Sequence, residues 1–71
     1  MSRPKKRSLT LRGHRTSVSL EDEFWDAFRE IAAAQGRALN DLAAEIDAER
    51  GMDTGLASEL RLFVLRELRA R

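Results

Sequence analysis

Residues 14–34, HRTSVSLEDEFWDAFREIAAA, decide the fold, because the spacing of their apolar residues changes within this stretch. Thr16, Val18 and Leu20 alternate with more polar residues, which is typical of a strand with one buried face. From Glu21 onward the apolar residues recur three or four positions apart, which is typical of an amphipathic helix. The stretch therefore predicts a strand that leads directly into a helix.

Two helices are predicted to follow this strand. The first begins near Glu21, where Ser19 and Asp22 have the spacing of a capping box, and it ends at Gly36. The second begins at Asn40, a residue type that commonly caps a helix N-terminus with its side chain.

A third helix is predicted after the loop at residues 51–55. Asp53 or Thr54 can cap its first turn, and arginines suit its C-terminal end. We expect this helix to complete the core. Its apolar stripe comprises Leu56, Leu60, Phe63, Val64 and Leu68, broadened by Leu62 and Leu65.

The charge of the chain is unevenly distributed. Residues 1–15 contain six basic residues and no acid, whereas residues 16–71 contain seven basic and all twelve acidic residues. Such asymmetry indicates a basic segment for a polyanion attached to an acidic body. We expect residues 1–7 to be a flexible basic arm and residues 8–71 to be the folded domain.

The segment before Gly13 also alternates, with Leu9 and Leu11 as its apolar residues. Their parity is opposite to that of Val18, so one flat strand cannot keep all three on one face. Gly13 is therefore expected to form a bulge or bend within a single strand region.

The size of the chain predicts self-association. Seventy-one residues, 42% of them hydrophobic, supply a small core, and the chain has no cysteine for a disulfide. A lone strand also leaves its backbone groups unpaired. The expected partner is the same strand of a second copy, paired antiparallel across a two-fold axis.

The sequence contains no motif that indicates an enzyme, a bound cofactor or a membrane protein. No nucleophile with a base, no glycine-rich phosphate loop and no paired metal ligands occur, and His14 is the only histidine. We therefore expect no enzyme activity, no cofactor and no metal. No apolar run has the length of a membrane span, and the basic start lacks the apolar stretch of a signal peptide, so a cytoplasmic location is expected.

From about His14 to Arg50 the chain resembles the ribbon-helix-helix family of small bacterial DNA-binding proteins, the class of the Arc and MetJ repressors. The resemblance rests on the stretch HRTSVSLEDEFWDAFREIAAAQGRALNDLAAEI. The whole chain looks like short members in which GHRTSVSLE opens the domain and an arginine-bearing third helix closes it. The resemblance implies a mostly α-helical fold with one N-terminal strand. It also implies an intertwined homodimer with an antiparallel β-ribbon between subunits.

The resemblance further implies that the ribbon enters the major groove of double-stranded DNA. The residues expected to contact bases are Arg15, Ser17 and Ser19. Those expected to contact phosphates are Lys5, Lys6, Arg7, Arg12 and Asn40. The expected dimer core is Thr16, Val18, Leu20, Phe24, Phe28, Ile31, Leu42 and Ile46.

The leading hypothesis is a homodimeric, sequence-specific DNA-binding protein that regulates transcription. One alternative is a protein-interaction module, antitoxin-like or an adaptor, which keeps the dimer but does not contact bases. Another is an architectural protein held on DNA by its basic arm. The charge of the ribbon face discriminates between them, since an acidic face would favour the interaction module.

Overall fold

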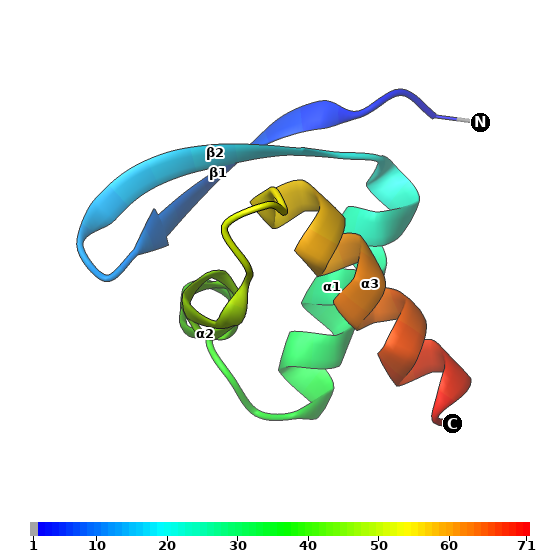
Figure 1. The fold of residues 1–71 in the computed structure, drawn as a ribbon. Helices are drawn as coiled ribbons and strands as arrows, with labels where there is room; N and C mark the ends of the chain where they lie inside the picture. Colours follow the sequence, from blue (N-terminus) through cyan, green and yellow to red (C-terminus); the bar gives the residue numbers. More distant parts are fainter. Residues whose placement is uncertain (1) are drawn as a thin grey trace.

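A β-hairpin lies across three helices (Figure 1). The structure is a computed structural model that describes residues 2–71. In chain order, the elements are β1 (Lys5–Leu11), β2 (His14–Leu20), α1 (Asp22–Ala34), α2 (Leu39–Glu49) and α3 (Leu56–Arg69).

Two consecutive residues, Arg12 and Gly13, form the turn of the hairpin. Their φ angles are 52° and 84°, and a two-residue turn with positive φ at both positions matches the twist of paired strands. The predicted bulge at Gly13 is therefore wrong, because the chain reverses there. The reversal also explains the change of parity. Leu9 of β1 lies directly opposite Thr16 of β2, and directly opposite residues share one face of the sheet.

The partner of β2 is a strand of the same chain, β1. The prediction of a lone strand is thus wrong, and so is the prediction that the arm includes residues 5–7. Lys5, Lys6 and Arg7 are the first three residues of β1. Their charge hid the strand, because lysine is depleted in strands.

The core lies between the inner face of the hairpin and the three helices. Leu9, Leu11, Val18 and Leu20 point inward from the strands and are buried. The expected dimer-core residues that are buried within this one chain are Val18, Leu20, Phe28, Ile31, Leu42 and Ile46.

Two of the expected core residues are not buried. Phe24 is half-buried against the core, and Thr16 is exposed although it lies on the same face as Leu9. The single chain does not test whether a partner buries Thr16, so its place in a dimer core stays a prediction.

Helix α1 ends at Ala34, and Gly36 lies in the turn that stops it, as predicted. The amide of Gly36 donates to the carbonyl of Ala33 (3.1 Å), and the amide of Arg37 donates to that of Ala32 (2.9 Å). These two bonds need a left-handed residue between them, and Gly36 has a φ of 65°. Glycine is favoured here because it adopts that conformation without steric cost.

The predicted side-chain caps are wrong at all three helices. The N-cap residues are Glu21, Ala38 and Gly55, and none of them caps through a side chain. Asn40 lies inside the first turn of α2 and not before it.

The stripe of α3 is buried over only part of its width. Leu60 and Val64 are buried and Phe63 is half-buried, whereas Leu62, Leu65 and Leu68 are exposed. Within residues 2–71, no helix combines the length and apolar character needed to cross a membrane.

Candidate nucleic-acid interface

The outer face of the hairpin is polar along its whole length. Because cross-strand partners share a face, the register assigns three pairs to this side, and all six side chains are exposed. The pairs are Lys6 with Ser19, Ser8 with Ser17, and Thr10 with Arg15. This outer face carries two cations, four hydroxyls and no carboxylate.

The three residues expected to contact bases lie on this face. Arg15, Ser17 and Ser19 are exposed and project away from the helices. The Ser19 hydroxyl is not occupied as a helix cap, since α1 has no side-chain cap. Sequence reasoning missed Ser8 and Thr10, although the alternation KRSLTL was the signal that could have placed them.

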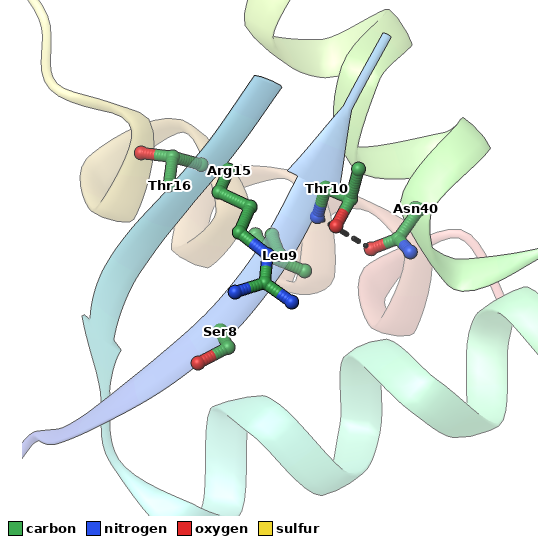
Figure 2. Close-up of a pocket in the computed structure, with 6 residues that line it drawn as sticks. All are labelled: Ser8, Leu9, Thr10, Arg15, Thr16 and Asn40. Atoms are coloured by element: carbon green, nitrogen blue, oxygen red, sulfur yellow. Dashed lines mark hydrogen bonds between the residues drawn. The ribbon is translucent and has the colours of Figure 1, made fainter. Parts of the chain in front are cut away.

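A hollow of about 250 Å³ lies on the outer face where β1 faces the start of α2. Figure 2 shows the Arg15 side chain extending from β2 across β1 toward Ser8. The guanidinium and the hydroxyls of Ser8 and Thr10 line this hollow, with Asn40 at its rim. These groups can donate hydrogen bonds, so the hollow suits an acceptor-rich partner such as a phosphate or the edge of a purine.

Asn40 connects α2 to the edge of β1. Its Oδ1 accepts a hydrogen bond from the backbone amide of Thr10 (3.2 Å) (Figure 2). This bond satisfies an amide that points away from β2 and orients the Asn40 side chain. The NH₂ group then remains available as a donor beside the hollow. Asp41 is also exposed in the first turn of α2, where its charge suits the helix dipole but disfavours a phosphate.

Two of the basic residues expected to contact phosphates form ion pairs within the chain. Lys5 Nζ lies 3.0 Å from Asp22 Oδ2, and Arg7 Nη2 lies 2.5 Å from Asp22 Oδ1. Arg7 also donates to the carbonyl of Leu20 (3.1 Å) and lies over the ring of Trp25 (5.5 Å to its centre). The Arg7 side chain is only 16% exposed, so it holds the hairpin on α1.

These contacts change the titration of the carboxylate. Hydrogen bonds from Arg7, and secondarily from Lys5, hold the pKa of Asp22 below its usual range. A further ion pair joins Arg61 of α3 to Glu21 (2.9 Å), and Arg61 also donates to the carbonyl of Ser19. Glu21 and Asp22 at the start of α1 are thus engaged by cations behind the outer face.

Three of the expected cations have no ion pair within residues 2–71: Lys6, Arg12 and Arg15. All three are exposed, with Arg12 in the turn and the other two on the outer face. The ribbon face therefore presents unpaired positive charge, and its charge does not favour the protein-interaction alternative.

A protein family described as the ribbon-helix-helix domain matches residues 4–68. This match spans both strands and the two helices after them, and it includes most of α3. No curated protein and no solved structure matches the chain significantly.

Proposed function

Since this chain belongs to the ribbon-helix-helix family, we propose that it is a homodimeric, sequence-specific DNA-binding protein that regulates transcription. The observation that supports this most is the outer face of the hairpin, which is exposed, polar and free of acid over three cross-strand pairs. A two-stranded ribbon fits the major groove, which is about 12 Å wide. The partner is double-stranded DNA, and the protein acts by binding and not by catalysis.

The outer face supplies contacts of two kinds. Arg15 is the principal base-contacting residue, because a guanidinium can donate two hydrogen bonds to O6 and N7 of guanine. Ser17 and Ser19 add shorter and more permissive hydrogen bonds. Lys6, Arg12 and Asn40 contact phosphates, which position the ribbon without specifying sequence. Lys5 and Arg7 contribute to the positive field but keep their bonds to Asp22.

The dimer pairs through β2. Leu11 and His14 flank the two-residue turn and are cross-strand partners that exchange hydrogen bonds. Because hydrogen-bonded and non-hydrogen-bonded pairs alternate along the hairpin, every second residue of β2 directs its N–H and C=O groups away from β1. These residues are Arg15, Ser17 and Ser19. Within residues 2–71 no backbone group bonds to them on that edge, where the Arg61 side chain donates to the Ser19 carbonyl. The opposite edge is engaged at Thr10 by Asn40.

Antiparallel pairing of two β2 strands gives a four-stranded sheet, β1–β2–β2–β1. Its outer face joins the two polar hairpin faces into one surface with both copies of Arg15 near its centre. The proposed intersubunit sheet differs from the ribbon predicted from the sequence, because each subunit contributes a hairpin and not one strand.

Selection of duplexes from a random pool, followed by titration, tests the proposal. Specific sites are typically bound at least about a thousandfold more tightly than non-specific DNA. We expect the selected duplex to be bound with a preference of that order over a scrambled duplex at physiological salt. Equal binding to both would favour the architectural protein, and no binding at low salt would favour the interaction module.

A further inference from the structure

Two arginines hold the junction between β2 and α1, at residues 19–22. Each donates to a backbone carbonyl of the junction, forms an ion pair with a carboxylate at the start of α1, and lies over an aromatic ring of α1. Arg7 of β1 makes these contacts from one edge of β2, and Arg61 of α3 makes them from the other. Side chains from two distant parts of the chain therefore fix the end of the strand.

Arg61 is itself held in place by α1. Its Nε and Nη2 both lie 2.9 Å from Oε1 of Glu21, and the guanidinium lies 5.7 Å from the ring centre of Phe24. The same Nη2 donates to the carbonyl of Ser19 (3.3 Å). Figure 1 shows α3 crossing α1 with its first turns beneath β2. Because the guanidinium is fixed on one side, its bond to Ser19 restrains the strand on the other.

The two carbonyls held by the arginines differ in what else restrains them. Leu20 is the cross-strand partner of Lys5, so the pairing of the hairpin holds its carbonyl even without Arg7. The carbonyl of Ser19 faces away from β1, and within residues 2–71 no backbone group bonds to it on that edge. Arg61 is thus its restraint in the described chain. A carbonyl oxygen has two lone pairs, so this bond is compatible with a second strand paired on the same edge.

The side chain of Ser19 needs such a restraint more than that of Arg15. Both lie on the outer face and are expected to contact bases. A serine hydroxyl lies close to its own backbone, and an O–H···O bond requires oxygen atoms about 2.5–3.0 Å apart. The long arginine side chain can compensate for a displaced strand by changing its rotamers, whereas serine cannot. The contact that Ser19 makes therefore depends on where its backbone is held.

We propose that Arg61 is a positioning residue for base recognition, which sets where the Ser19 hydroxyl meets the DNA by holding the Ser19 carbonyl from behind the outer face. This rests on the proposed function, which assigns Ser19 to base contacts. Arg61 does not touch the duplex, because its partners are at the junction and on α1. Helix α3 thereby takes part in recognition without approaching the DNA.

Position-by-position titration tests this role. Duplexes that each carry one substituted base pair of the selected site are bound to wild type, Ser19→Ala and Arg61→Ala. The Ser19→Ala variant identifies the positions that Ser19 contacts. We expect Arg61→Ala to lower the preference at the same positions by about two- to tenfold, the worth of one hydrogen bond, and to leave the positions contacted by Arg15 unchanged. The combined variant should lose no more there than Ser19→Ala alone, because both changes act on one contact.

Two further variants separate positioning from stability and from charge. Gln35→Ala removes a second side-chain link between α1 and α3, the bond from Gln35 Nε2 to Glu67 Oε1 (2.7 Å), which lies far from β2. It should lower the melting temperature without changing the preference at any position. Arg61→Lys keeps the charge but loses the planar fork that reaches two acceptors at once. It should show the same loss at the Ser19 positions as Arg61→Ala, whereas an effect of charge alone would disappear.

The outcomes separate this role from the proposed function. If Arg61→Ala weakens all duplexes by one factor, as Gln35→Ala does, or if Ser19→Ala changes no preference, the positioning role is overturned and the DNA-binding function stands. If the wild type selects no duplex, the proposed function fails and the role in recognition fails with it. The ¹³C resonance of the Ser19 carbonyl, which should shift in Arg61→Ala, then shows whether Arg61 restrains the strand in solution.

Discussion

The two faces of the hairpin place the same type of residue in opposite surroundings. Arg7 on the inner face is mostly buried and contacts Asp22, Leu20 and Trp25, whereas Arg15 on the outer face has no ion pair within residues 2–71. One arginine is used for the fold and the other is available to a partner. Parity along a strand, and not residue type, therefore assigns a cation to the fold or to binding.

The largest expected effect comes from charging the inner face. Val18→Asp should abolish folding, because it buries a carboxylate between the hairpin and the helices without a partner. Ser17→Ala, one residue away on the outer face, should change the free energy of unfolding by less than about 0.5 kcal/mol. Urea unfolding followed by circular dichroism measures both. A folded Val18→Asp variant would show that the two faces are wrongly assigned.

A smaller effect is expected from removing the outer arginine. Arg15→Ala should lower the discrimination between selected and mutated duplexes by about 1–3 kcal/mol, because a bidentate base contact is lost. Lys6→Ala, on the same face, should weaken binding to all duplexes equally and reduce the salt slope by about one unit. Titrations at several salt concentrations measure both quantities. Loss of discrimination in Lys6→Ala but not in Arg15→Ala would show that Lys6, and not Arg15, contacts bases.

The inner arginine should affect stability more than DNA discrimination. Arg7→Ala removes charge-assisted hydrogen bonds to Asp22 and Leu20, and we expect a loss of about 1–2 kcal/mol in the free energy of unfolding. Its preference for the selected duplex should be unchanged once binding is measured on folded protein. A changed preference would mean that Arg7 leaves its partners and contacts DNA.

The smallest expected effect is a dependence of stability on acid. Because the pKa of Asp22 is lowered in the folded chain, its contribution is complete above the ordinary value of 3.8 and is lost as the pH falls through the folded pKa. Asp22→Asn should therefore remove part of the decrease in melting temperature below about pH 4 and flatten the curve there. A curve of unchanged slope would show that Arg7 and Lys5 do not hold the carboxylate in solution.

The predicted helices and most of the core followed from local pattern. Phe28 and Ile31 are buried as their spacing indicates, and Gly36 ends α1 because the turn there needs a left-handed residue. The outward direction of Arg15 also follows from alternation alone. Such features depend on neighbours within a few residues, so the sequence displays them directly.

The second strand and the engagement of Asn40 did not follow from local pattern. Taken alone, the segment KKRSLTL shows only a run of charged residues and two leucines. Its pairing with β2 makes it a strand and places Arg7 beside Val18 and over α1. Asn40 has the composition of a cap, yet its oxygen bonds to Thr10, thirty residues earlier. Both outcomes depend on which distant backbone groups need a partner.

By itself, the sequence determined the helical spans, the buried face of β2 and the polarity of the opposite face, because periodicity acts through the geometry of one element. Only the tertiary structure decided that the basic segment is a strand and that Lys5 and Arg7 are engaged by Asp22. It also left the edge of β2 without a backbone partner, and Leu62, Leu65 and Leu68 of α3 exposed. Pairing and exposure are properties of surfaces brought together from distant parts of the chain, and no single stretch of residues encodes them.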